Sequence, residues 1–139
     1  MCGAVHYECT AEPVFAANCH CRDCQRATGS AFAATLFAPR STVTITGDVR
    51  YYKVTGESGN GVSRGFCPTC GARLFTKPAI IPDLIGIVAG SLDDPSGFRP
   101  AMDIYTVSAR PWDYLSPALR KFERSPTEDQ IKEILTSGR

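Results

Sequence analysis

The chain has 139 residues, a formal net charge of +1 and 43% hydrophobic residues, which suits one domain with a core of its own. The balanced charge does not favour a nucleic-acid partner, and the longest apolar stretch, 80–90, is too short to cross a membrane. Its seven cysteines are an odd number that internal disulfides cannot use up. Residues 1–7 show no basic and apolar leader. We therefore expect a cytoplasmic protein whose spaced cysteines bind metal and which has no nucleic-acid or membrane partner. The sequence does not predict its oligomeric state.

Most of the chain consists of short β-forming runs separated by glycine and proline. Strands are predicted at 4–9, 31–37, 42–46, 49–54, 62–66, 73–76, 84–89 and 102–107. The third and fourth flank Gly47 and Asp48, a pair that predicts a two-residue β-hairpin turn. No repeat or long linker divides the sequence, so we predict a single zinc-binding domain over 1–139 with a mainly β fold.

Two helices are predicted between and after these strands. A short helix is expected at about 23–28, ended by Gly29. A second is expected at the C-terminus, over 125–137, where Ser125 provides the N-cap and Glu128 completes a capping box. Its apolar face consists of Ile131, Ile134 and Leu135.

The segment Cys67-Pro-Thr-Cys70-Gly71 is the most specific local signal. Two cysteines at this spacing can bind one metal ion from a tight knuckle, and the following glycine permits a left-handed turn. A redox Cys-x-x-Cys is the alternative, but that motif is typical of a βαβ context, which this sequence does not show. We predict half of a structural zinc site here, which Cys2 joins if the first strand starts beside the knuckle.

A second group of thiols lies at Cys19, Cys21 and Cys24. Structural zinc sites are usually closed by four protein ligands, whereas catalytic sites keep one position open. Three thiols therefore indicate a catalytic site. His20 is an alternative fourth ligand, but adjacent residues rarely reach one ion together, so we expect His20 to form hydrogen bonds nearby instead.

A zinc ribbon is the alternative arrangement of these cysteines. It would pair Cys21 and Cys24 with Cys67 and Cys70, although 42 residues lie between the two pairs, against about 15–20 in that signature. One metal ion per chain would favour the ribbon, and two would favour separate sites. Cys9 is expected to be a small buried apolar residue.

Taken together, these motifs resemble the glutathione-dependent formaldehyde-activating enzyme family, which includes centromere protein V-like proteins. The matching segments are Cys2-Gly3-Ala4-Val5, Cys19 to Phe32, Arg64 to Gly71 and Pro111-Trp112. The resemblance implies coiled antiparallel sheets and two zinc ions. Cys2, Cys67 and Cys70 would hold a structural zinc, and Cys19, Cys21 and Cys24 a labile catalytic one.

The first cysteine of the family's opening Cys-x-Cys-Gly would fall just before Met1, so the fourth ligand of the structural zinc does not carry over. The alternatives are a site that lacks this ligand, a water or Met1 amine in its place, or a true start that lies upstream.

The resemblance also implies a carbon–sulfur lyase-type activity in which glutathione, or a similar thiol, binds at the three-cysteine zinc and adds to formaldehyde, giving S-hydroxymethylglutathione. Zinc lowers the pKa of a bound thiol. Arg22 and Arg26 are expected to hold the glutathione carboxylates, although solvated surface arginines are the plainer interpretation. Trp112 is expected to bind substrate and would line a cleft with Tyr105, Tyr114 and Phe98, although aromatic residues of a sheet domain more often belong to its core. Asp103 stands where many family members carry a histidine.

Two functions of other classes stay open. A zinc-stabilised binding module would expose an apolar patch and have no open metal position. A thiol or metal sensor would lose its metal under oxidation and form a reversible disulfide. An enzyme should instead bind glutathione saturably, in a way that depends on Cys21.

Overall fold

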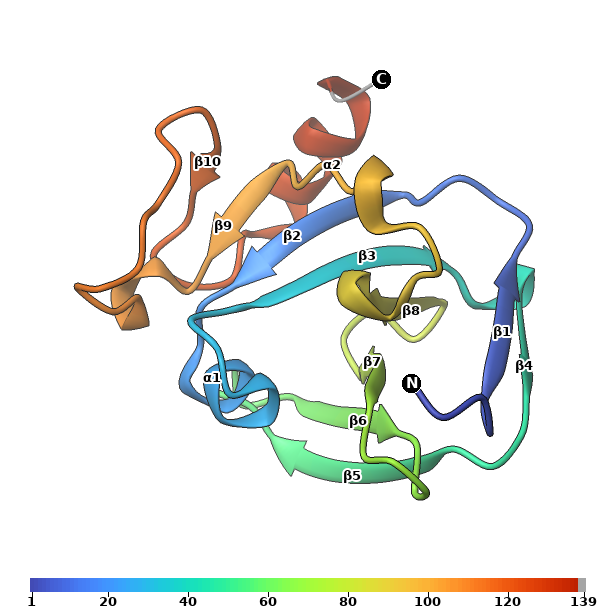
Figure 1. Ribbon diagram of the computed structural model, residues 1–139. Helices are drawn as coiled ribbons and strands as arrows, with labels where there is room; N and C mark the ends of the chain where they lie inside the picture. Colours follow the sequence, from blue (N-terminus) through green and yellow to red (C-terminus); the bar gives the residue numbers. More distant parts are fainter. Residues whose placement is uncertain (138–139) are drawn as a thin grey trace.

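The computed structural model describes residues 1–137 and consists mainly of short strands joined by turns (Figure 1). The strands are β1 (His6–Cys9), β2 (Phe15–Cys19), β3 (Ala33–Pro39), β4 (Val43–Thr46), β5 (Arg50–Thr55), β6 (Gly61–Phe66), β7 (Arg73–Pro78), β8 (Leu84–Val88), β9 (Met102–Ile104) and β10 (Arg120–Lys121). The α-helices are α1 (Arg22–Thr28) and α2 (Glu128–Ser137). The 3-10 turns are η1 (Arg40–Thr42), η2 (Ala89–Ser91), η3 (Pro95–Gly97) and η4 (Thr106–Ser108). The predicted mainly β class with a C-terminal helix is confirmed, and residues 138 and 139 of the predicted domain lie outside the described residues.

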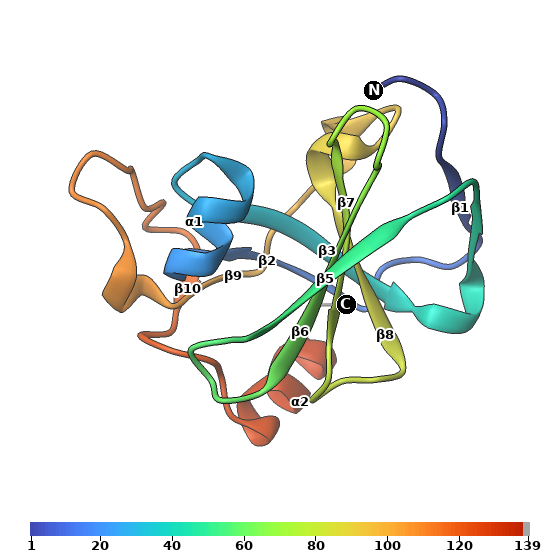
Figure 2. The same ribbon diagram turned by 90° about the horizontal axis from the view of Figure 1, so that it is seen from below.

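Most strands belong to one sheet, in the order β10-β9-β2-β3-β8-β7-β6-β5, and β1 pairs with β4 in a separate two-stranded sheet. The large sheet is antiparallel except that β9 pairs in parallel with both β2 and β10. Figures 1 and 2 show that it is strongly coiled, since β6 to β8 run across the direction of β2 and β3. The coiling brings β6 beside α1, far from it in sequence.

The main core lies between the two sheets. Phe75 on β7 and Ile87 on β8 are cross-strand partners, and both are fully buried. The ring of Tyr7 on β1 packs edge-on against Phe75, with ring centroids 5.1 Å apart. This aromatic contact joins the small sheet to the large one. Cys67 belongs to the same core cluster, so the knuckle is anchored in the most buried part of the fold.

The hairpin predicted at Gly47 and Asp48 is wrong, because β4 pairs with β1 and β5 pairs with β6. Gly47 is instead required by a close approach. It has a φ of 101°, and a Cβ at this position would overlap the backbone oxygen of Ala4. Gly47 therefore lets the chain pass from β4 in the small sheet to β5 in the large sheet.

Three further local expectations need correction. The capping box of α2 is formed by Thr127 and Gln130 rather than by Ser125 and Glu128: the Thr127 N–H donates to Gln130 Oε1 at 2.8 Å, and the Gln130 N–H to Thr127 Oγ1 at 3.3 Å. Cys9 is exposed on β1, and its thiol donates to the Ala11 carbonyl at 3.2 Å. Strands β2 and β10 were not predicted.

Strand β2 escapes prediction because its three central residues are all buried and therefore give no alternating pattern of apolar and polar residues. The apolar face of α2 is as expected, with Ile134 buried against β2 and β9 residues. Neither described helix is long and apolar enough to span a lipid bilayer.

Candidate metal centres

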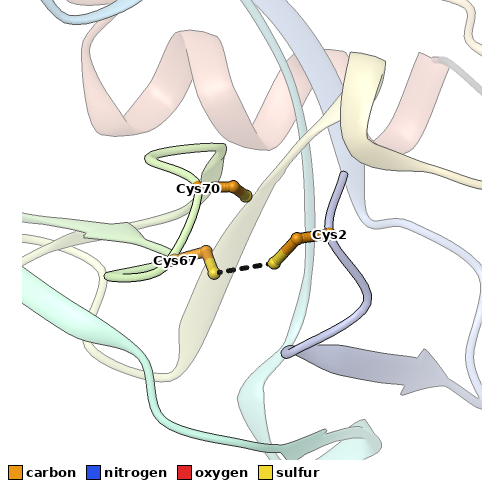
Figure 3. A group of neighbouring side chains, drawn as sticks. All are labelled: Cys2, Cys67 and Cys70. Carbon is orange, nitrogen blue, oxygen red and sulfur yellow. Dashed lines mark hydrogen bonds between the residues drawn. The ribbon is translucent and has the colours of Figure 1, made fainter.

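The first candidate metal centre is formed by Cys2, Cys67 and Cys70 (Figure 3). Cys67 follows β6, and the chain turns back at once: the Gly71 N–H donates to the Cys67 carbonyl at 2.8 Å, and the Cys67 N–H donates to the Ala72 carbonyl at 3.0 Å. Gly71 has a φ of 77°, the left-handed conformation the knuckle requires. The N-terminal segment brings Cys2 to the open side of this turn.

The spacing of these three thiols suits zinc. The Cys2 and Cys67 sulfurs are 3.7 Å apart, and all three sulfurs lie within 4.8 Å of one another. Tetrahedral zinc, with Zn–S bonds of about 2.3 Å, holds its sulfur ligands roughly 3.8 Å apart. The thiols can therefore converge on one ion with little movement.

Cys70 is the most acidic thiol of this group. Its pKa is lowered to about 6, mainly because the thiolate accepts backbone hydrogen bonds from Ala72 and then from Cys2, with smaller contributions from the Cys2 and Cys67 thiols. A thiol that is already ionised near neutral pH is a ready metal ligand.

In metal-free protein, we expect Cys70 to be alkylated faster than Cys9 at neutral pH. Both are accessible, and a Cys70 pKa of about 6 leaves mostly the reactive thiolate at pH 7. Iodoacetamide labelling followed by peptide mass spectrometry should show the Cys70 rate rising through about pH 6 and then levelling. Equal rates for the two thiols at pH 7 would contradict the assignment.

The second candidate centre is formed by Cys19, Cys21 and Cys24, whose sulfurs also lie within 4.8 Å of one another. Cys19 ends β2, and Cys21 is the N-cap of α1, where its sulfur accepts the Cys24 N–H at 3.3 Å. Gly29, with a φ of 65°, ends the helix. The first turn of α1 thus holds Cys21 and Cys24 close to Cys19 at the end of β2.

The two cysteine groups are separate, which contradicts the zinc-ribbon pairing. Cys21 and Cys24 gather with Cys19, whereas Cys67 and Cys70 gather with Cys2. The two cysteine pairs that a ribbon would join therefore belong to different groups of described residues.

Arg64 is a site residue that the sequence analysis did not assign. It lies on β6, is only 9% exposed, and donates from Nη1 to the Cys24 sulfur at 3.5 Å. Arg73 on the neighbouring strand β7 donates to the Ala27 carbonyl of α1 at 3.4 Å. Burial and the positive charge of Arg64 lower the pKa of Arg73.

The thiols of the second group have very different pKa values. The pKa of Cys24 is held well below its ordinary value by hydrogen bonds from the Cys19 and Cys21 thiols, and the positive Arg64 adds to this effect against burial. The pKa of Cys19 is raised well above its ordinary value, because its thiol bonds to the other two sulfurs and is buried. Without metal, the group therefore keeps its negative charge on Cys24.

His20, between Cys19 and Cys21 in the cysteine loop, forms hydrogen-bonding contacts nearby, as predicted. Its ring is 1% exposed and lies between two carboxylates: Nε2 is 3.0 Å from Asp103 Oδ1, and Nδ1 is 3.1 Å from Asp113 Oδ2. Asn18 Nδ2 also donates to Asp103 Oδ1, at 3.1 Å. Asp103 is thus a buried anchor for His20 and Asn18. The network ties the cysteine loop to β9 and to the segment that contains Asp113.

The two arginines predicted to bind substrate lie on the exposed face of α1. The Arg22 N–H donates to Glu57 Oε1 at 3.0 Å, and its guanidinium contacts Gln25. Arg26 Nη1 is 3.9 Å from Asp23 Oδ1, and its side chain is 67% exposed. Both arginines are accessible beside the Cys19 group.

The four aromatic residues proposed for a cleft differ in burial. Trp112 and Tyr114 are 72% and 80% exposed, whereas Phe98 packs against the main core. Tyr105 is buried against Cys21 and Cys24. It is also the one non-glycine residue among 1–137 with a positive φ, 57°, and such strain is often found at functional sites.

Comparisons with known proteins agree with this description. A family model described as glutathione-dependent formaldehyde-activating enzyme matches residues 1–108. The search of curated proteins found no match. A crystal structure of a Rhodobacter sphaeroides protein is similar in fold, with a TM-score of 0.52 and 23% sequence identity, over 71% of this chain and 86% of that chain.

Proposed function

Because the chain belongs to the glutathione-dependent formaldehyde-activating enzyme family, we propose that it joins glutathione, or a similar thiol, to formaldehyde as S-hydroxymethylglutathione. The reaction is of the carbon–sulfur lyase type, and its site is the group formed by Cys19, Cys21 and Cys24. The observation that carries the proposal is the convergence of these three thiols within 4.8 Å of one another, beside the buried guanidinium of Arg64.

Zinc is the metal that we assign to both cysteine groups, since thiolate ligands favour it. Cys2, Cys67 and Cys70 would hold a structural ion that fixes the N-terminus to the core. Cys19, Cys21 and Cys24 would hold an exchangeable ion with one position left for a thiol. Zinc bound there would act as a Lewis acid that lowers the pKa of the thiol.

The reaction is an addition with a simple balance of atoms. The thiol sulfur donates an electron pair to the formaldehyde carbon and forms the C–S bond. The π pair of the carbonyl moves to oxygen, which takes up a proton in place of the one that the thiol gives up, so one proton moves from sulfur to oxygen overall and nothing is oxidised or reduced. Tyr105 packs against Cys21 and Cys24, and burial raises its pKa, so its protonated hydroxyl would be a hydrogen-bond donor for this oxygen.

Binding and orientation supply most of the rate in this proposal. Formaldehyde is already a strong electrophile, so the required acceleration is modest and positioning can provide much of it. Arg26 has only a long, exposed contact with Asp23, which is worth little, so it can turn to a glutathione carboxylate. Arg22 provides a second cation on the same helix face, and exposed Trp112 offers an apolar surface to the peptide.

The proposal is tested by following adduct formation with carbon-13 formaldehyde and glutathione by NMR. The protein should accelerate the reaction in proportion to its concentration, and Cys21→Ser should lose at least about 100-fold of that acceleration, since even residues behind metal ligands cost 10–100-fold. Cys9→Ser is the matched control and should react like the original protein. If Cys21→Ser binds glutathione and forms the adduct unchanged, capture of the thiol at this group is wrong.

A further inference from the structure

The two cysteine groups differ in whether a buried positive charge lies beside them. The Cys19 group has Arg64 within hydrogen-bond distance, and Arg64 is 9% exposed. No arginine or lysine among residues 1–137 donates a hydrogen bond to Cys2, Cys67 or Cys70. A buried cation has thus been placed beside one group and not the other.

Burying a guanidinium is costly unless an anion compensates it. Neither Arg64 nor Arg73 has a carboxylate within 4.0 Å among the described residues. The Arg64 guanidinium has the Cys24 sulfur as its hydrogen-bond partner, and the Nε atoms of both arginines are buried without a partner. For the buried Arg64, the compensating negative charge therefore comes from the cysteine group itself.

The number of charges then limits what the group can bind. Three thiolates around a divalent ion carry one negative charge in all, which a single arginine neutralises. Arg73, partly exposed on the neighbouring strand and bonded to the Ala27 carbonyl of α1, adds a second positive charge that favours an anionic fourth ligand. A neutral fourth ligand would gain nothing from either charge.

We propose that Arg64 and Arg73 make this site selective for an anionic fourth ligand, a thiolate, over a neutral one. The inference rests on the proposed function, because it takes a metal ion and a thiol to meet at Cys19, Cys21 and Cys24. Both arginines act through the charge of the cysteine group and are positioning residues.

Two probes of different charge test this selectivity in cobalt-substituted protein, whose visible spectrum reports on exchange of the fourth ligand. Glutathione provides a thiolate, and imidazole provides a neutral nitrogen. Arg64→Gln should weaken glutathione binding by about 10–100-fold, the usual effect of groups behind metal ligands, and leave imidazole binding within about 2-fold. Arg64→Lys, which keeps the charge, should recover much of the loss.

Arg73→Gln, at a less buried position, should also weaken glutathione binding more than imidazole binding, but by a smaller factor. This variant replaces Arg64→Gln in the test if Arg64→Gln does not fold. Arg50→Gln, an exposed arginine on β5, is the matched control and should change neither affinity. Equal weakening of both probes, or no weakening of glutathione binding, would overturn the proposed selectivity while glutathione binding itself still stands. If the cobalt spectrum of the unaltered protein responds to neither probe, the proposed function fails and the inference fails with it.

Discussion

Cys67→Ser is expected to lower the free energy of unfolding by roughly 5 kcal/mol, since a buried hydroxyl without a partner costs about 1–3 kcal/mol and the lost metal ion about 4 kcal/mol at a metal concentration of 1,000 Kd. Cys67 is 2% exposed and packs in the main core with Phe75. The substitution removes one thiol from the knuckle and leaves Cys2 and Cys70 with no shared third ligand. The N-terminal segment would lose its attachment to the core as well.

Urea unfolding, followed by tryptophan fluorescence with and without a chelator, measures this loss. Cys9→Ser is the control, because Cys9 is exposed and lies outside both cysteine groups, and it should change stability by less than about 0.5 kcal/mol. The chelator should destabilise the original protein strongly and Cys67→Ser much less. A Cys67→Ser variant as stable as the original, with an equal response to the chelator, would show that this group holds no structural metal.

His20→Ala is expected to cost about 3 kcal/mol, since a buried polar group left without its partner costs about 1–3 kcal/mol and the emptied ring position adds a cavity. The imidazole fills a fully buried position between the carboxylates of Asp103 and Asp113. Its removal leaves two carboxylates facing an empty space, with only Asn18 to donate a hydrogen bond to Asp103. The cysteine loop would also lose its attachment to β9.

A double-mutant cycle isolates the energy of this pair. His20→Ala, Asp103→Ala and the double variant are unfolded in urea in the same metal-loaded state, and a coupling energy above about 1 kcal/mol is expected for two buried residues that share a hydrogen bond. Asp113→Asn, which keeps the size of the side chain, should cost less than His20→Ala. Additive effects of the two alanine substitutions would mean that His20 and Asp103 do not stabilise one another.

Local sequence predicts the features whose causes are local. The knuckle at Cys67 and Cys70 follows from the spacing of the cysteines and from Gly71, and the turn around Cys21 and Cys24 follows from an N-cap and a closing Gly29. These patterns act within a few residues. They could therefore be recognised without knowing which strands are neighbours.

Long-range pairing accounts for what the sequence does not predict. Arg64 and Cys24 are 40 positions apart, and His20 and Asp103 are 83 positions apart. The first contact depends on how the large sheet coils, and the second on the parallel pairing of β2 with β9. The Gly47 turn is missed for the same reason, because its glycine makes room for the backbone of Ala4, which is distant in sequence but lies at the same end of the small sheet.

Metal analysis is the most direct test of the view that the chain holds two separate metal centres. Protein loaded with zinc and then desalted in the presence of glutathione should contain two zinc ions per chain. Cys21→Ser and Cys67→Ser should each contain one, and the double variant none. A single ion per chain in the original protein, lost equally in either single variant, would contradict two separate centres.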